Sequence, residues 1–166
     1  GSGAQVTLVE DGPLRKSFRV ERSQEGSTFV QYIRMTALSD RIDCVNEVDW
    51  QTQERMLKVQ FPFPFSTSQD TYDISLGTIA RGIRNADCYE VQGHQWADHT
   101  AASGLYGVSI LNDCKYGWDK PDARTLRLTL LHTPSCGGYK HQANMDMGPN
   151  QFTYAILPHD GGWNQL

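Results

Sequence analysis

Hydrophobic and polar residues alternate one by one over several short stretches of this chain, and this pattern constrains the fold more than any other feature. In the stretch 41–50 the hydrophobic side chains fall on one face, interrupted by a single asparagine: Ile42, Cys44, Asn46, Val48 and Trp50. The other face is mostly charged. Because successive side chains of a strand point to opposite faces, this period of two predicts a half-buried β-strand.

The same alternation recurs along the chain. It appears at 56–61, where Pro62 and Pro64 are expected to end the strand because proline has no N–H to donate. It appears again at 125–130, and at 29–37 with Gln31 as the exception. Further candidate strands are 5–9, 15–22, 71–79, 87–96 and 152–157. About ten short strands with no clear helical stripe between them predict an all-β fold, an antiparallel β-sandwich.

Composition excludes several classes of partner. Of 166 residues 39% are hydrophobic and 20% are charged, values compatible with one globular domain or with a part of a larger one. The net charge is −4 without a basic run, so we expect no nucleic-acid partner. No apolar run approaches the roughly 20 residues of a membrane helix, so we expect no membrane partner.

The ends and the cysteines suggest how the chain is organised. Residues 1–3 (GSG) have the composition of a cloning scar, which leaves 4–166 as a single β-sandwich domain. Cys44, Cys88, Cys114 and Cys136 are widely spaced and form no CxxC pair, which favours free thiols in a reducing compartment over disulfides. The Gly-rich and polar segment 134–149 is predicted to be one long exposed loop.

A second long connection is predicted at 112–124, between the apolar runs 106–111 and 126–130. Hairpin loops usually have two to five residues, and longer ones tend to be functional or disordered. This segment begins with Asn112, Asp113, Lys115 and Tyr116, which supply an amide, a carboxylate, an ammonium group and an aromatic ring. Such groups bind sugar hydroxyls and pack against sugar faces, so these four residues are the candidate substrate-binding residues.

Three motifs together resemble a known family. They are VDWQTQERMLKVQFPFPF (48–65), HQWADHT with YGVSILNDCKYGW (94–118) and FTYAILPHDG (152–161). In this order they are similar to the C-terminal β-sandwich region of glycoside hydrolase family 38 α-mannosidases, over roughly residues 10–162. The form NDCKYG (112–117) resembles the cytosolic and bacterial branch of that family.

The resemblance implies a galactose-mutarotase-like super-sandwich that is a fragment of a larger multidomain enzyme. The full enzyme would hydrolyse terminal α-mannosyl linkages with retention, in the cytoplasm. Its zinc, the zinc ligands and the nucleophile belong to an N-terminal catalytic domain of the same chain, so this fragment is expected to bind no cofactor and to hold no catalytic or metal-ligating residue. The expected partners are that domain and a mannosyl oligosaccharide substrate. Lys115 matches the basic residue that the sandwich lends to the sugar cleft.

Several residues that could act as metal ligands or catalytic groups have a simpler structural interpretation. The five histidines form no HxH or HxxxH pair, and we interpret His94, Asp98 and His99 as strand-end and turn residues rather than metal ligands. Trp96 is expected to end a strand and fill the core, Asp98 to cap a turn, and His159 to be a rim or turn residue after Pro158 rather than a ligand. Asp113 and Lys115 could also form a local salt bridge that ties their loop to the sandwich.

Two alternative functions remain open at this stage. A stand-alone carbohydrate-binding module would carry exposed aromatic side chains in one patch, whereas a domain of a larger enzyme would expose an apolar patch that its neighbour covers. A mutarotase-like enzyme would need a histidine and a glutamate that converge in a groove.

Overall fold

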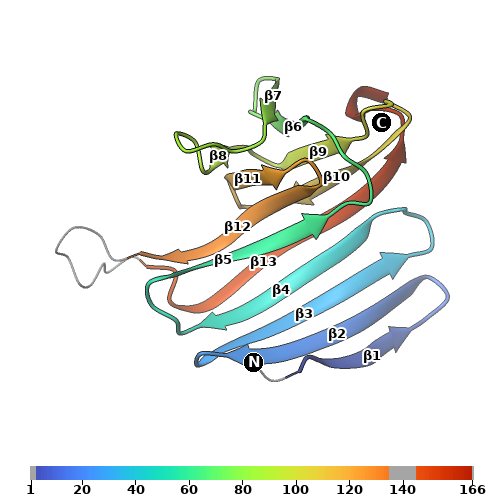
Figure 1. Cartoon of the computed structure of the whole chain (residues 1–166). Coiled ribbons are helices and arrows are strands. Elements are labelled where there is room, and N and C mark those ends of the chain that lie inside the picture. Colours follow the sequence, from blue (N-terminus) through green and yellow to red (C-terminus); the bar gives the residue numbers. More distant parts are fainter. Residues whose placement is uncertain (1–2, 135–144, 166) are drawn as a thin grey trace. The chain divides into compact units, whose positions relative to one another are not determined.

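The computed structural model of the chain describes residues 3–134 and 145–165, and most of their regular structure is β-strand (Figure 1). In chain order the elements are β1 (Gln5–Asp11), β2 (Arg15–Gln24), β3 (Ser27–Thr36), β4 (Ile42–Trp50), β5 (Arg55–Pro62), β6 (Gln69–Asp73), β7 (Thr78–Gly82), β8 (Val91–Gln92), β9 (Trp96–Thr100), β10 (Tyr106–Asn112), β11 (Gly117–Asp122), β12 (Thr125–Thr133), β13 (Gly148–Asp160) and the 3-10 helix η1 (Trp163–Gln165). No α-helix occurs in these described residues, which confirms the all-β prediction.

The chain forms two compact units. The first unit holds Gly1–Leu57 and Leu131–Ala155, and the second holds Lys58–Leu130 and Ile156–Leu166. In the first unit β1, β2, β3 and β4 lie side by side as antiparallel neighbours, with β13 next to β4 (Figure 1). The β2–β3 hairpin turns at Glu25 and Gly26, which have φ angles of 49° and 82°. Positive φ at both central residues is what a tight two-residue hairpin requires.

The buried face of β4 explains why two polar residues interrupt the hydrophobic pattern. Cys44, Asn46, Val48 and Trp50 are all buried in the first unit. Gln31 of the neighbouring β3 donates from Nε2 to Asn46 Oδ1 and to the hydroxyl of Tyr154, both at 2.8 Å. Buried polar groups are tolerated when they bond one another. The predicted face is therefore correct, and its polar members form one bonded cluster.

The second unit is a sandwich of two sheets. One contains β10, β9, β6 and β7 in that order, with the end of β13 beside β10, and the other contains β5, β12, β11 and β8. The rings of Tyr72 on β6 and Trp118 on β11 meet edge to face at 6.2 Å between their centres. A Cβ at Gly93 would lie 2.8 Å from the Trp118 ring, so only glycine fits beside this contact. The antiparallel β-sandwich prediction is thereby confirmed.

The alternation at 41–50, 56–61 and 125–130 places hydrophobic side chains in the core, and among these the following are buried as expected: Val48, Trp50, Leu126, Leu128 and Leu130. Ile42, Leu57 and Val59 are only half-buried. The predicted exposed loop at 134–149 lies largely outside the described residues, and its last two residues already belong to β13. β13 also continues beyond Pro158 to Asp160 instead of closing there.

The prediction of a long loop at 112–124 is wrong, because β11 lies inside it. Only residues 113–116 connect β10 to β11, and residues 123–124 then turn into β12. Trp118, Asp119 and Lys120 are all buried, and β11 has a strand on each side. Because buried charged residues lie on both faces of this strand, its sequence shows no alternation of hydrophobic and polar residues from which a strand could be predicted.

Two other predicted strands have different limits. The segment 71–79 is a hairpin of β6 and β7 that turns at Ser75, whose φ is 71°. In the segment 87–96 only β8 is extended, and Trp96 begins β9 instead of ending a strand. Turn-forming residues interrupt each of these two predicted strands, and the pattern of apolar residues alone did not locate the turns.

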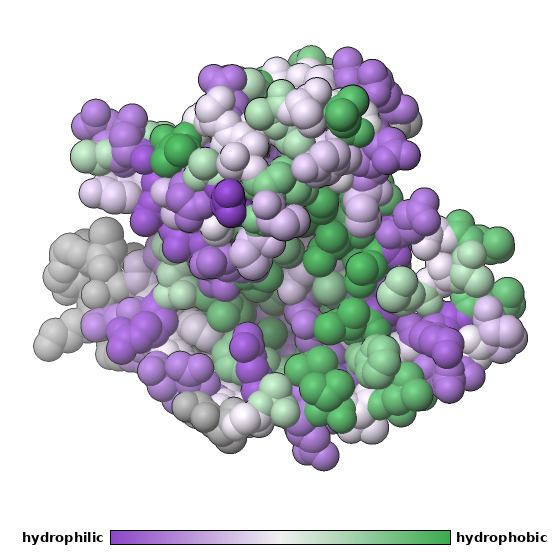
Figure 2. All heavy atoms as spheres, turned by 45° about the vertical axis from the view of Figure 1, so that its right-hand side comes forward, coloured by the Kyte–Doolittle hydropathy of each residue, from purple (hydrophilic) through white to green (hydrophobic). Residues whose placement is uncertain are grey.

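An exposed apolar face lies on strands β1–β3 of the first unit. Val6, Leu8, Phe18 and Met35 are 61%, 47%, 44% and 54% exposed. Leu8 pairs with Phe18, and Phe18 with Ile33, which places these side chains on the same face. Figure 2 shows hydrophobic surface in the lower part of the view, at the height of these strands. Such a contiguous patch is typical of a surface that a neighbour covers.

Candidate functional site

The four candidate binding residues lie at the end of β10 and in its link to β11, and Asn112, the last residue of β10, fixes the shape of that link. The Asn112 Oδ1 atom accepts hydrogen bonds from the backbone N–H groups of Cys114 (3.1 Å) and Lys115 (2.6 Å). Its Nδ2 atom donates to the His94 carbonyl at 2.9 Å, and its own N–H donates to the Gln95 carbonyl at 2.7 Å. Asparagine is favoured here because its side chain can close a turn on its own backbone. Asn112 is thus an anchor of the loop.

The remaining three candidates present different groups from this anchored loop. Asp113 is exposed, Lys115 is half-buried and the Tyr116 ring is 57% exposed. Partial burial, followed by a hydrogen bond with Asp113, raises the pKa of the intervening Cys114 thiol to about 11. The thiol is therefore protonated near neutral pH and is a poor nucleophile. The loop offers hydrogen-bonding groups and a ring, which suits binding more than bond cleavage.

Two other loops of the second unit adjoin this one. The His94 ring meets the Tyr116 ring edge to face at 5.7 Å, and the Gly93 N–H donates to the Tyr116 carbonyl at 3.0 Å. The His94 Nδ1 atom also bonds the Ser75 hydroxyl in the β6–β7 turn. Residues 73–77, 92–95 and 112–117 therefore form one loop cluster, which we call the Tyr116 loops. These three segments are far apart in the sequence, so only the fold brings them together.

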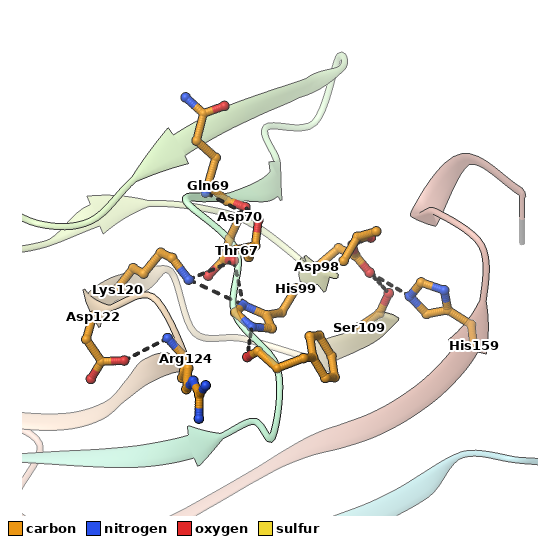
Figure 3. A network of polar contacts seen from close by, with 12 residues as sticks. Thr67, Gln69, Asp70, Asp98, His99, Ser109, Lys120, Asp122, Arg124 and His159 are labelled. Atoms are coloured by element: carbon orange, nitrogen blue, oxygen red, sulfur yellow. Dashed lines mark hydrogen bonds and ion pairs between the residues drawn. The ribbon is translucent and has the colours of Figure 1, made fainter. Parts of the chain in front are cut away.

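The side chains of His94, Asp98 and His99, the three candidate ligands of the motif HQWADH, lie in three different environments. His94 lies in the Tyr116 loops, whereas His99 is fully buried and its Nδ1 atom bonds Asp70 Oδ1 at 2.7 Å (Figure 3). Asp98 lies on the other face of β9. In the residues that the structure describes, no group of three or more His, Cys, Asp or Glu side chains could hold a metal ion.

Asp98 and His159 belong to a buried polar cluster instead of the turns that the sequence predicts. Asp98 Oδ2 accepts from the Ser109 hydroxyl and from His159 Nε2, each at 2.7 Å (Figure 3). Thr100 donates to the other carboxylate oxygen. The turn assignments for Asp98, His99 and His159 are therefore wrong, because Asp98 and His99 lie within β9 and His159 lies within β13. Their role remains structural.

The described histidines give no support to a mutarotase-like pair. His94 bonds Ser75 and Gln92, His99 bonds Asp70, and His159 bonds Asp98. His132 contributes its backbone N–H to Asp146. Within the described ranges, the hydrogen bonds of these side chains include none to a glutamate.

Sequence reasoning missed a charged cluster on the second sheet. Asp119, whose side chain is fully buried, accepts hydrogen bonds from Lys58 (2.8 Å) and Arg127 (3.0 and 3.2 Å). Burial alone would raise the pKa of Asp119, but the hydrogen bonds and charges of Arg127 and Lys58 outweigh it and lower this pKa. No local pattern signals the cluster, since its members lie on three strands.

Comparisons with known proteins agree with this fold. A sequence model described as "Glycosyl hydrolases family 38 C-terminal domain" matches residues 2–137. The chain is 36% identical to alpha-mannosidase 2C1 of Mus musculus over 124 residues, and 32% identical to alpha-mannosidase G of Dictyostelium discoideum over 164 residues. These matches cover 72% and 93% of this chain but only 11% and 14% of those proteins.

A solved structure supports the fold as well. The crystal structure of an alpha-mannosidase from Enterococcus faecalis V583 superposes with a TM-score of 0.83 at 15% identity, covering 95% of this chain and 22% of that one. In the described residues no helix is long and apolar enough to span a membrane. The match over most of the chain, together with its relatives, identifies the chain as a member of the glycosyl hydrolases family 38 C-terminal domain family.

Proposed function

We propose that the chain is the C-terminal β-sandwich domain of a cytoplasmic α-mannosidase that hydrolyses terminal α-mannosyl linkages with retention. The proposal rests on the family and on relatives named alpha-mannosidase, of which the chain spans only about a tenth to a seventh. The zinc and the carboxylate nucleophile that this reaction requires would lie in the catalytic domain of the same chain. The residues described above would act by binding and positioning.

The first role of the domain in this proposal is to complete the sugar cleft with the Tyr116 loops. The observation that carries it is the Asn112 anchor, which fixes the backbone of Lys115 before any ligand binds. A preorganised loop loses less conformational freedom when it binds a sugar. Lys115 would donate hydrogen bonds to sugar hydroxyls, and the exposed Tyr116 ring would pack against a sugar face.

The second role is to support the catalytic domain. The exposed apolar face of β1–β3 favours a domain of a larger enzyme over a stand-alone carbohydrate-binding module, because the latter has no use for it. We expect the isolated chain, with or without added zinc, not to cleave an aryl α-mannoside. Turnover that stays with the chain through repeated purification, and is lost on its denaturation, would contradict this expectation.

The decisive test replaces Lys115 by methionine in the full-length enzyme. Methionine keeps much of the volume but removes the charge and the donors. If Lys115 bonds the substrate, kcat/KM should fall roughly ten- to a hundredfold, since a hydrogen bond from a charged group contributes about 1.5–3 kcal/mol. The melting temperature should hardly change, because an ion pair of Lys115 with the exposed Asp113, if it forms, contributes at most about 1 kcal/mol.

Lys16→Met is a matched control, because Lys16 is an exposed lysine of the first unit that pairs with Asp11 at 2.7 Å. It should leave kcat/KM unchanged. Unchanged kcat/KM in Lys115→Met together with a clearly lower melting temperature would show that Lys115 serves the fold and not the sugar.

A further inference from the structure

A pocket of about 480 Å³ in the second unit has an excess of positive charge. It is lined by the end of β7, the segment from there to the start of β8, and β11, and among its lining residues are Arg81, Arg84, Tyr89, Glu90 and Asp119. Lys58 and Arg127 bond Asp119 directly. Three cations (Arg81, Arg84 and Lys120) and two carboxylates (Glu90 and Asp119) line the pocket, and Lys120 is paired with the buried Asp70 outside it. With Lys58 and Arg127 beside Asp119 the positive charge is in excess, although the chain as a whole carries a net charge of −4. We call this site the Arg84 pocket.

The carboxylates of the pocket are already engaged. Asp119 is fully buried and bonded to Arg127 and Lys58, and its lowered pKa keeps it ionised. Glu90 pairs with Lys58 at 3.3 Å and accepts a hydrogen bond from Thr129. In the described residues neither acid accepts a hydrogen bond from Arg81 or Arg84, although Asp119 lies within ion-pair distance of Arg84.

Arg84 and Arg81 retain positive charge and hydrogen-bond donors that could bind an anionic ligand. Arg84 reaches Asp119 only as an ion pair at 3.7 Å, beyond hydrogen-bond length, and its side chain is 39% exposed. Across the described ranges its guanidinium makes no hydrogen bond. Arg81 donates to the Gln92 carbonyl and lies over the Tyr72 ring, at 5.8 Å from the ring centre, and neither contact cancels its charge. The planar guanidinium fork matches the oxygens of a phosphate group.

The pocket also offers an aromatic surface. Tyr89 lines it with a ring that is 64% exposed. Asn85 shapes the segment before it, because its Oδ1 accepts from the backbone N–H groups of Asp87 (3.0 Å) and Cys88 (2.9 Å). A hydrogen-bonded turn therefore precedes the ring, which lines the same pocket as the arginines. Aromatic rings combine apolar contact area with a polar tip, which suits the face of a sugar.

We propose that the Arg84 pocket binds a hexose phosphate, with Arg84 and Arg81 at the phosphate and Tyr89 against the sugar ring. The phosphate follows from the uncancelled charge of the pocket, and the choice of a hexose rests on the proposed function. The site is distinct from the Tyr116 loops in its residues. Binding of a hexose phosphate to this chain can be measured without any catalytic turnover. A negative result in the Lys115→Met test would therefore not affect the interpretation of this measurement.

The experiment is isothermal titration calorimetry of the 166-residue chain at low ionic strength with mannose 6-phosphate, mannose and inorganic phosphate. We expect mannose 6-phosphate to bind at least tenfold more tightly than either of the other two. Arg84→Gln should weaken that binding at least tenfold. Tyr89→Ala should weaken the binding of mannose 6-phosphate but not the binding of inorganic phosphate. Arg41→Gln, at an exposed arginine of the first unit, is the matched control and should change nothing.

Two results would overturn the proposal. One is equal affinity for mannose 6-phosphate and inorganic phosphate, and the other is unchanged affinity in a folded Arg84→Gln variant. If that variant does not fold, chemical-shift mapping on the unsubstituted chain decides the matter. Shifts centred on Arg84 and Tyr89 support the site, and shifts confined to other residues refute it.

Discussion

The buried triad of Asp70, His99 and Lys120 should dominate the stability of the second unit. All three side chains are completely buried (Figure 3). Asp70 Oδ1 accepts from His99 Nδ1 at 2.7 Å and from Lys120 Nζ at 3.2 Å. The His99 ring is also stacked on Phe63, with 4.2 Å between ring centres. The triad therefore joins strands β6, β9 and β11 across the two sheets of the sandwich.

The perturbation is Asp70→Asn, which removes the charge and keeps the shape. It leaves the Lys120 ammonium buried without its carboxylate, and removing one partner of a buried pair costs about 3–5 kcal/mol. For a chain of this size each kcal/mol lowers the melting temperature by about 2–4 °C. We therefore expect a decrease of roughly 6–20 °C. Lys120→Met should cost less, because His99 still donates to Asp70.

The double variant Asp70→Asn with Lys120→Met provides the critical comparison. It removes both charges together, so its loss of stability should be at least about 1 kcal/mol smaller than the sum of the two single losses. Urea unfolding followed by tryptophan fluorescence, to which the buried Trp118 contributes, gives the free energies. The exposed pair control, Lys16→Met, should cost at most about 1 kcal/mol. Strict additivity of the two single changes would refute the inference that these charges stabilise one another.

Two further predictions concern the core and the acid response. Leu128→Ala should cost about 2–5 kcal/mol in urea unfolding because Leu128 is fully buried, whereas Leu38→Ala should cost far less at a side chain that is 94% exposed; equal losses would contradict the assigned core. The lowered pKa of Asp119 contributes stability that is present above its unfolded pKa of about 3.9 and is lost as pH falls through the folded value. The melting temperature of the unsubstituted chain should therefore fall more steeply than that of Asp119→Asn between pH 5 and pH 2.5, and parallel curves would show that Asp119 does not drive the acid response.

The sequence by itself determined the strands that have one buried face. In β4 the alternation placed Val48 and Trp50 in the core, because a half-buried strand must put its hydrophobic residues on one side. The motif around Asn112 and Lys115 likewise indicated the family and the candidate loop. These features are local, so neighbouring residues carry enough information to predict them.

Only the tertiary structure decided the features that depend on partners distant in sequence. Lys120 is buried in β11 because Asp70, 50 residues earlier, compensates its charge, and without that partner the sequence favours an exposed loop. His94 joins Asn112 and Tyr116 in one cluster only because β9 and β10 pair. Buried charges and converging loops are stabilised by long-range contacts, and a period of two carries no information about which distant residue supplies the contact.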